Sequence, residues 1–545
     1  MENYKESRNT YQRLIREYPE SSFIQDARVQ LLGLFYTDGK YNELIKEGKT
    51  IPEGSLSPIH MARVYLLIGD AYIQTGFPAD ALYFYMKAHE KAPSYEKESI
   101  AEKMNSSAGQ LNSEDTRALL NVLKQKPDEV CMMYRLGLIL YNTGKEGNAR
   151  SALSEFISKC PGDKNMYDAK RLIGIIDQKV EVFKLETIGC ALPLSGPYKI
   201  YGEKALKGIE LALAKFSSKS GYTTIKIRVK DTGSEPEKVV NAIKELSNAK
   251  AAAIIGPLVE AKSAALEAQD RGIPMVALTQ KDDVASQGEF IFRNFFSPSM
   301  QVKAIVSYAM GTLKLKKFAI IYPNENYGSI FMNLFWDEVV ANGGRIVGVQ
   351  HYNVSQTDFT DTVKKLVGLY YDVPGRKMNP ETDEPEPVID FEALFIPEAP
   401  KKAALIMPQL AYHDVENVYF FGTNLWHSQK LIELADRYVQ GAIMVDGFFA
   451  ENDSQEVKDF VSVFEETYGE KPGFIEAVSY DTAMMLFTLI SKPDVGSRSD
   501  LMMEMRKLKD YMGVTGLTSF DDNGDVHKKF YLLRVKGEEF VQIEY

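Results

Sequence analysis

One short stretch of the chain carries oxygen-bearing residues at nearly the spacing that a bound cation requires. Asp521, Asn523 and Asp525 alternate like the first three ligands of a calcium-binding loop. The sixth position of such a loop needs glycine, and here it is Val526. The twelfth position needs a bidentate carboxylate, and here it is Leu532. We therefore predict a hairpin turn at this place and no metal site in the chain.

The residues that could act in catalysis are just as isolated. Ser94 and Lys97 have the spacing of a serine nucleophile and its lysine, but no companion motif accompanies them. The six histidines are scattered, and no nucleophile-elbow sequence is present. We predict no catalytic residue and no cofactor, so an enzyme is the class of protein that the sequence favours least.

The charge and hydropathy patterns exclude two further classes of partner. The formal net charge is −11, and lysine and arginine form no concentrated stripe. Nucleic acid and anionic lipid surfaces are therefore not expected partners. No uninterrupted apolar run approaches the roughly 20 residues that cross a bilayer, so we predict no transmembrane segment.

The first 180 residues have the pattern of paired helices at a period of roughly 34 residues. Gly69 and Gly137 lie two such periods apart, and so do Pro93 and Pro161. Small residues at these points let two helices approach closely, and the prolines end the second helix of each pair. We predict a tetratricopeptide-like domain over 1–180, with about four repeats and a lone helix in front of them.

This helical domain has two interpretations that the sequence leaves open. A stack of such repeats makes an extended surface that binds a protein partner. It can equally serve as a spacer that holds the second half of the chain away from an anchor.

After residue 181 the hydrophobic period changes, and short β-rich runs alternate with amphipathic helices, which indicates parallel α/β units. The expected strands are 183–192, 225–230, 252–255, 274–278, 318–322, 345–351, 393–397, 418–422 and 442–449. The expected helices are 203–216, 236–248, 260–270, 328–342, 400–412, 455–468 and 474–491. A terminal hairpin is expected over 518–545, and a solvated Pro-rich insertion over 372–390.

Several segments carry a family resemblance in a fixed order: PLSGPYKIYGEKALKGIELA, DTGSEPEKVV, IIGPLVEAKSAAL, GIPMVAL, FRNFFSPSMQ, AIIYPNENYG, YDTAMML and VTGLTSFDDNGD. This run resembles the type I periplasmic solute-binding proteins of the leucine/isoleucine/valine class. The resemblance implies two α/β lobes, each with a doubly wound parallel sheet, that bind a ligand between them. It implies lobe 1 at 181–298 with 450–512 and lobe 2 at 299–449 with 513–545. Three crossovers are expected near 296–299, 448–450 and 511–515.

The residues at the expected cleft depart from what a free amino acid needs. Leu258 and Glu260 follow a Gly-Pro loop where the family often has a small hydroxyl residue. Glu260 would repel a ligand carboxylate from the helix N-terminus that follows it. Thr279 can still donate a hydrogen bond, but two acids follow it, and Asn424 stands where a carboxylate would bind an ammonium group. Both sets of binding groups are weakened, so a free amino acid is disfavoured as a ligand. A cleft that binds another small molecule and a cleft that has lost its ligand both agree with these departures.

Five further residues are cleft candidates by their place in the pattern. Ser195 and Tyr201 flank the first loop, Tyr327 precedes a helix, and Trp426 and Phe449 could form apolar walls. The alternative for the aromatic residues is that they fill domain interfaces, and Ser195 is also suited to a simple turn.

The whole chain has a second resemblance, carried by its architecture and by two short matches, Gly256-Pro257-Leu258 and Ala277-Leu278-Thr279-Gln280. It resembles the outer-membrane lipoproteins that activate penicillin-binding proteins, which also have helical repeats, this binding fold and a late polar insertion. The resemblance implies a non-enzymatic regulator of peptidoglycan synthesis whose partner is a penicillin-binding protein or another envelope protein. The alternative is a solute-binding receptor of the ABC-transporter type. A third interpretation is a scaffold that uses only the repeat surface.

The start of the sequence bears on where the protein works. Met1 leads directly into a charged amphipathic segment, so no signal peptide is present in the sequence as given. Together with the family resemblance, this predicts a periplasmic lipoprotein whose export signal is missing from the sequence.

The three cysteines leave the redox compartment undecided. Cys131 and Cys160 fall in the two helices of one repeat, so a disulfide between them is conceivable. The favoured interpretation is that they are buried free thiols, as is expected for Cys190.

Overall fold

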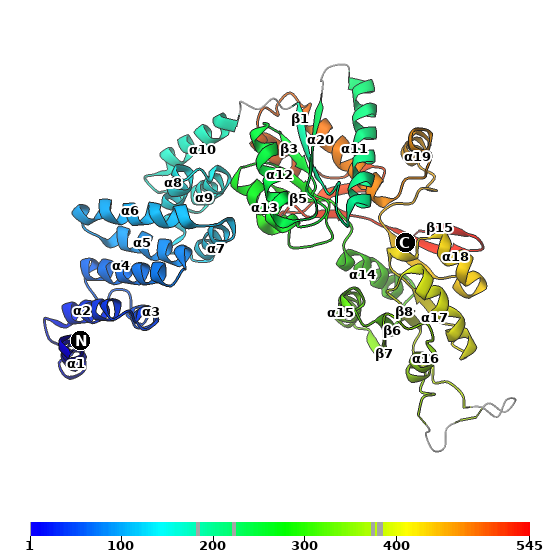
Figure 1. The fold of residues 1–545 in the computed structure, drawn as a ribbon, viewed down its shortest axis with the longest axis horizontal. Coiled ribbons are helices and arrows are strands. Elements are labelled where there is room, and N and C mark those ends of the chain that lie inside the picture. Colours follow the sequence, from blue (N-terminus) through cyan, green and yellow to red (C-terminus); the bar gives the residue numbers. More distant parts are fainter. Residues whose placement is uncertain (1, 181–185, 221–224, 372–376, 379–384, 545) are drawn as a thin grey trace.

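The computed structural model describes residues 2–180, 186–220, 225–371, 377–378 and 385–544. A stack of helices, called the arm here and comprising residues 2–180, is followed by two α/β lobes (Figure 1). This is the predicted fold class, an all-α repeat domain in front of a two-lobed binding fold.

The arm consists of paired antiparallel helices. Its helices are α1 (Glu2–Glu17), α2 (Ile24–Thr37), α3 (Tyr41–Lys49), α4 (Pro58–Gln74), α5 (Pro78–Lys91), α6 (Ser94–Gln110), α7 (Ser113–Lys124), α8 (Met133–Asn142), α9 (Glu146–Lys159) and α10 (Met166–Val180). The helices α2 and α3, α4 and α5, and α8 and α9 pack as pairs, whereas α6 and α7 each pack against α5. The helix α1 precedes them and packs against α2, so it is not the lone helix that the sequence pattern predicted.

Glycines allow the close approach of the two helices in a repeat. A Cβ atom on Gly69 would lie 2.5 Å from the Tyr85 ring, and one on Gly137 would lie 2.7 Å from Leu153. Neither contact leaves room for a larger residue, which explains why these positions recur at the repeat period.

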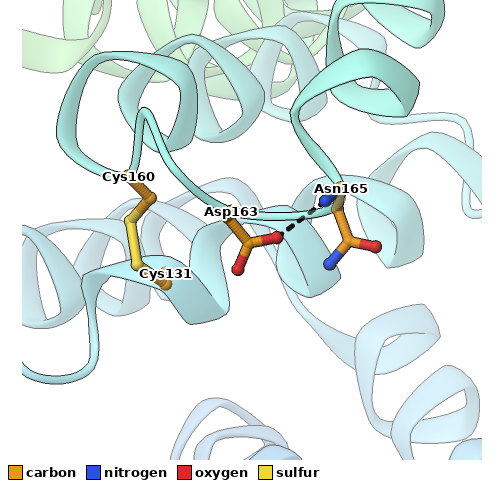
Figure 2. Close-up of a disulfide and its surroundings, with 4 residues drawn as sticks. All are labelled: Cys131, Cys160, Asp163 and Asn165. Atoms are coloured by element: carbon orange, nitrogen blue, oxygen red, sulfur yellow. Dashed lines mark hydrogen bonds between the residues drawn. A yellow bond between two sulfur atoms is a disulfide. The ribbon is translucent and has the colours of Figure 1, made fainter.

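Cys131 and Cys160 form a disulfide (Figure 2). Cys131 lies in a 3₁₀ turn just before α8, and Cys160 caps the C-terminus of α9. The antiparallel pairing of α8 and α9 brings these two helix ends together, with the Cα atoms 5.9 Å apart. In the loop that follows, the Asn165 N–H donates to Asp163 at 2.8 Å (Figure 2). The prediction of two free thiols is therefore wrong for this pair, while Cys190 is free and buried.

Acid is expected to destabilise the arm through His89, which is only 8% exposed. Burial, together with the charges of Arg135 and Lys97, lowers the pKa of His89 to about 4. The unfolded chain binds the proton more readily, so stability is lost as the pH falls from about 6.5 to about 4, by up to roughly 3 kcal/mol. Urea titrations between pH 7 and 4.5 should show this loss, and His89→Gln should show a shallower pH dependence. Equal slopes would contradict the prediction.

Lobe 1 is built on a parallel sheet with the strand order β2-β1-β3-β4-β5. The strands are β1 (Thr187–Leu192), β2 (Lys226–Asp231), β3 (Ala253–Ile255), β4 (Met275–Ala277) and β5 (Ile291–Arg293). The covering helices are α11 (Lys199–Ser220), α12 (Pro236–Asn248), α13 (Ala261–Asp270), α19 (Gln455–Tyr468), α20 (Phe474–Ile490) and α21 (Arg498–Arg506).

Lobe 2 has a sheet with the strand order β15-β14-β10-β9-β8-β6-β7, parallel except at β14 and β15. The strands are β6 (Lys317–Pro323), β7 (Arg345–Tyr352), β8 (Ala393–Phe395), β9 (Tyr419–Phe421), β10 (Ile443–Asp446), β14 (Tyr531–Lys536) and β15 (Glu539–Ile543). The helices are α14 (Pro298–Val306), α15 (Asn326–Ala341), α16 (Thr360–Leu366), α17 (Pro400–Tyr412) and α18 (Gln429–Ala435).

The chain crosses between the lobes three times. The first crossing joins β5 to α14 and the second joins β10 to α19, both close to the expected places. The third follows a small antiparallel sheet of β11 (Tyr511–Gly513), β12 (Gly516–Phe520) and β13 (Val526–Lys528). Val514, Phe520 and Val526 belong to the core of lobe 1, so this crossing lies between β13 and β14, later than 511–515.

The remaining sequence predictions concern the insertion at 372–390, the turn at 521–525, metal sites and transmembrane segments. Within the insertion predicted at 372–390, residues 372–376 and 379–384 lie outside the described residues. The turn at 521–525 contains no metal-ligand cluster: the Asp521 carboxylate accepts from the N–H groups of Asn523 and Asp525 at 2.9 and 2.8 Å. In the described part of the chain, no group of three or more potential metal ligands occurs, and no helix combines the length and hydropathy needed to cross a bilayer.

Candidate ligand-binding cleft

The polar loops of lobe 1 meet at one edge because its strands are all parallel. Strands β1, β2, β3 and β4 end at Leu192, Asp231, Ile255 and Ala277, and the loops that follow them lie at the same edge of the sheet. Residues from four of these loops line a cleft between the lobes, and lobe 2 faces them with the loop after β9.

The cleft has a volume of about 630 Å³. It is lined by Tyr198, Tyr201, Lys204, Ser234, Leu258, Val259, Glu260, Leu278, Thr279, Gln280, Lys281, Phe295, Phe296, Asn424, Leu425, Gly473, Phe474, Ile475 and Glu476. This volume lies within the range of roughly 300–1,000 Å³ that small-molecule sites usually have.

Five of the nine residues expected at the cleft lie in its lining: Tyr201, Leu258, Glu260, Thr279 and Asn424. Glu260 is the residue before α13 and has a left-handed backbone conformation, with φ at 53°. Its side chain lines the cleft beside the N-terminus of this helix without a capping hydrogen bond, and its negative charge disfavours an anionic ligand group there.

Asn424 and Thr279 face the cleft from opposite lobes. The Asn424 N–H donates to the Gln301 side chain at 3.0 Å, which fixes the loop after β9. Thr279 is almost fully buried, and its hydroxyl accepts the Lys281 N–H at 3.5 Å. Both side chains are uncharged, so the two walls offer hydrogen bonds at these points rather than ion pairs.

Ser195 is not part of the lining, and it shapes the first loop instead. The Asp231 carboxylate accepts from the N–H groups of Leu194, Ser195 and Gly233 at 2.8, 3.1 and 2.9 Å. Burial alone would raise the pKa of Asp231, but these hydrogen bonds outweigh it and hold the pKa below its usual range. Ser195 thus belongs to a rigid connection between the loops after β1 and β2.

Three aromatic residues expected at the cleft lie inside lobe 2. Trp426 is 0% exposed and lies against Gly422. Phe449 contacts His427 and Tyr531 in the core of the lobe. Tyr327 forms a hydrogen bond with Thr423 at 2.8 Å beneath the loop that carries Asn424. These side chains support the lobe 2 wall and do not line the cleft.

The apolar wall is formed instead by three phenylalanines that sequence analysis did not propose. Phe474 at the start of α20 contacts Phe295 and Phe296 in the first crossover, with ring centroids 5.1 and 5.9 Å apart. The crossover expected near 296–299 could have pointed to Phe295 and Phe296, because the segments that join the two lobes pass beside the cleft between them. Nothing in the sequence links Phe474 to them.

Charged and polar residues missed by the sequence analysis complete the lining. Lys204 lies 3.2 Å from the carboxylate of Glu476, which also accepts the Gly473 N–H at 3.1 Å. The Ser234 hydroxyl is buried and has no hydrogen-bond partner in the described part of the chain. A buried hydroxyl without a partner is costly, so Ser234 is suited to bind a polar ligand group.

A cleft between two α/β lobes, lined at the carboxyl ends of parallel strands, defines a solute-binding fold. The periplasmic binding protein family matches residues 187–539, and the tetratricopeptide repeat family matches residues 1–21 and 132–163. The chain belongs to the periplasmic binding protein family and carries a helical repeat domain in front of it.

Individual relatives agree with this assignment. The chain is 27% identical over 188 residues to the Leu/Ile/Val-binding protein homolog 3 of Brucella melitensis, which covers 33% of this chain and 50% of the relative. It is 24% identical over 192 residues to the Leu/Ile/Val-binding protein of Escherichia coli, which covers 34% and 52%. The chain thus spans about half the length of these curated relatives.

Solved structures match the two lobes over nearly their full length. A putative branched-chain amino acid ABC transporter from Rhodospirillum rubrum has a TM-score of 0.57 at 21% identity, which covers 66% of this chain and 99% of that one. A substrate-binding protein from Sphaerobacter thermophilus has a TM-score of 0.54 at 18% identity, with coverages of 66% and 96%. At these identities the likeness establishes the fold alone.

Proposed function

We propose that the chain is a non-enzymatic binding protein of the cell envelope whose inter-lobe cleft takes a small, partly aromatic or apolar solute. The observation that supports it most is the composition of the cleft. Two tyrosines and three phenylalanines line it together with hydroxyl and charged groups from lobe 1 and the Asn424 amide from lobe 2. Such a mixture suits a ligand with an apolar body and a few polar groups.

The same cleft disfavours a simple free amino acid as its ligand. Glu260 places a negative charge at the N-terminus of α13, where a carboxylate of the ligand would need to bind. Asn424 offers a neutral amide to an ammonium group, which forms a weaker interaction than a carboxylate does. A ligand with a neutral hydrogen-bonding group at each wall fits these residues better.

A thermal-shift screen tests this function directly. Free amino acids, short peptides, aromatic acids and muropeptides are added to the purified chain, and a ligand that prefers the folded state raises the melting temperature. We expect neutral aromatic compounds, such as the amides of the aromatic acids added to the same library, to raise it, and free amino acids to leave it unchanged. A flat result over the whole library would contradict the proposal.

Tyr201→Ala should weaken the binding of any ligand found in this way by about tenfold, because Tyr201 is 45% exposed and lines the cleft. Isothermal titration calorimetry measures the change in affinity. Tyr412→Ala is the matched control, since Tyr412 is exposed on α17 and does not line the cleft. Equal effects of the two substitutions would argue against binding at this site.

A second function is favoured by the arm, namely activation of a penicillin-binding protein through protein contacts. Its stacked helices form an elongated surface of the kind that repeat proteins use to bind partners. Reconstitution of the chain with the cognate peptidoglycan synthase tests this role. An unchanged synthesis rate would count against it.

A periplasmic location, with attachment to a membrane as a lipoprotein, belongs to the same proposal. The Cys131–Cys160 disulfide supports it, because structural disulfides persist in oxidising compartments and are rare in the cytosol. Cell fractionation and mass spectrometry of the native protein would reveal both the compartment and a lipid anchor.

A further inference from the structure

The arm and lobe 1 share a broad polar interface. Arg150 on α9 is 8% exposed, and its guanidinium donates to Asp177 on α10 at 2.9 Å and to Glu289 of lobe 1 at 3.4 Å. The Ser151 hydroxyl donates to the same Glu289 carboxylate at 3.0 Å, and the Ser499 hydroxyl on α21 donates to Asp177 at 2.8 Å. Arg150 thus connects α10 to Glu289 of lobe 1, and its partner Asp177 is in turn bonded to α21.

A second network lies beside the first and reaches the lobe 1 backbone. Gln269 on α13 is 3% exposed, and its amide donates to Asn148 and Ser151 of α9 at 3.4 and 3.3 Å. Its side-chain oxygen accepts the Phe290 N–H at 3.0 Å, and the Asn148 amide donates to the Asp270 carboxylate. Buried polar groups of this kind are costly to separate, because each would lose its partner.

Backbone contact at Gly147 shows how tightly the two parts fit. A Cβ atom on Gly147 would lie 1.9 Å from the Gln269 carbonyl oxygen and 2.8 Å from the Gly272 nitrogen. The start of α9 therefore touches the end of α13 without an intervening side chain. Any residue other than glycine would force the arm away from lobe 1.

A third point of contact comes from a different arm helix. Arg117 on α7 donates to the Ser286 carbonyl and to the Gln287 side chain, in the loop before β5. Because α7, α9 and α10 all contact lobe 1, the arm is held at three separate places (Figure 1). With a single point of contact the arm could rotate relative to lobe 1, and contacts at three separate places prevent this rotation.

We propose that the arm and lobe 1 form one rigid body, so that opening or closing of the cleft moves lobe 2 relative to the arm. A protein partner that contacts both the arm and lobe 2 would then bind one cleft state more tightly than the other. By thermodynamic linkage, the factor by which a cleft ligand changes the affinity for the partner equals the factor by which the partner changes the affinity for that ligand. This inference goes beyond solute binding and does not depend on which ligand the cleft takes.

Double electron–electron resonance on the full chain measures the rigidity without any ligand. Spin labels are placed in pairs at Asn42→Cys on α3, Asn241→Cys on α12 and Asn333→Cys on α15, which are exposed in the arm, lobe 1 and lobe 2. The native cysteines do not interfere, because two are bonded and Cys190 is buried. We expect one narrow distance distribution between the arm and lobe 1. A broad or multimodal distribution for this pair would overturn the proposal.

Gly147→Ala tests whether this interface is the cause of the rigidity. We expect this substitution to broaden the distribution of distances between the spin labels on the arm and on lobe 1. Gly174→Ala on α10 is the matched control and should leave it narrow, because a Cβ atom there meets nothing within 4 Å. Arg117→Ala provides a second test if circular dichroism shows that Gly147→Ala is misfolded. If the distribution stays narrow in the folded variants, another contact holds the arm and the assignment to this interface is wrong.

Discussion

Replacing Cys131 and Cys160 together by alanine is expected to lower the free energy of unfolding of the arm by about 3–4 kcal/mol. The disulfide joins residues 29 positions apart, and closing a loop of this length removes conformational entropy from the unfolded chain. The bond also fastens the ends of α8 and α9, and α9 carries much of the contact with lobe 1. Urea denaturation followed by circular dichroism measures the loss.

Reduction provides an independent check of the same prediction. A reductant should destabilise the wild-type chain to the same extent and have no further effect on the double variant. Cys190→Ala is the matched control and should respond to the reductant as the wild type does, because Cys190 forms no disulfide. A wild-type chain that is insensitive to reductant under conditions that open the bond would contradict the prediction.

The repeat and strand patterns were predictable because they depend on local periodicity. Glycines such as Gly69 recur where the backbones of two helices meet, and this requirement leaves a spacing in the sequence. The helices α16, α18 and α21 were not predicted, since seven to nine residues are too few to establish an amphipathic period. The strand β5 was also missed, although β3, β4, β8 and β9 are equally short and were predicted, so its length alone does not explain the miss.

The cleft was predictable only where topology determines it. Glu260, Thr279 and Asn424 follow strand ends, and parallel strands bring such loops to one edge. Trp426 was expected at the cleft, but the burial of an aromatic side chain depends on what packs over it, which the sequence does not reveal. Phe474 was not predicted at the cleft. Its contacts in the first crossover lie far away along the chain, and no local pattern links them to it.

The sequence analysis favoured free thiols over the Cys131–Cys160 disulfide for a geometric reason. The two cysteines were assigned only to the two helices of one repeat, without a register that decides whether their side chains meet. In the structure they lie at the helix ends that an antiparallel pair brings together. The repeat period predicts which helices pair, but an error of two or three residues in a helix boundary decides whether two cysteines can meet.

Asp481→Ala is expected to cost about 3–5 kcal/mol of stability in lobe 1, because it removes the acceptor at the centre of a buried network. Asp481 on α20 is 2% exposed and accepts from the N–H groups of Val514 and Thr515 at 2.8 and 2.7 Å and from the Thr515 hydroxyl. Lys528 on β13 donates to the same hydroxyl at 2.7 Å. Alanine would leave two buried N–H groups and the Thr515 hydroxyl without their acceptor, and it would remove the negative charge near Lys528.

This network joins α20 to the small sheet that precedes the third crossover, so its loss should also reach the cleft. The first turn of α20 carries Phe474 and Glu476, both of which line the cleft. We therefore expect Asp481→Ala to lower the melting temperature and to weaken ligand binding together. Asp494→Ala, at an exposed position, is the control for both measurements. A variant that loses stability but keeps full ligand affinity would show that the cleft wall is held by the α20 core alone, without help from the crossover.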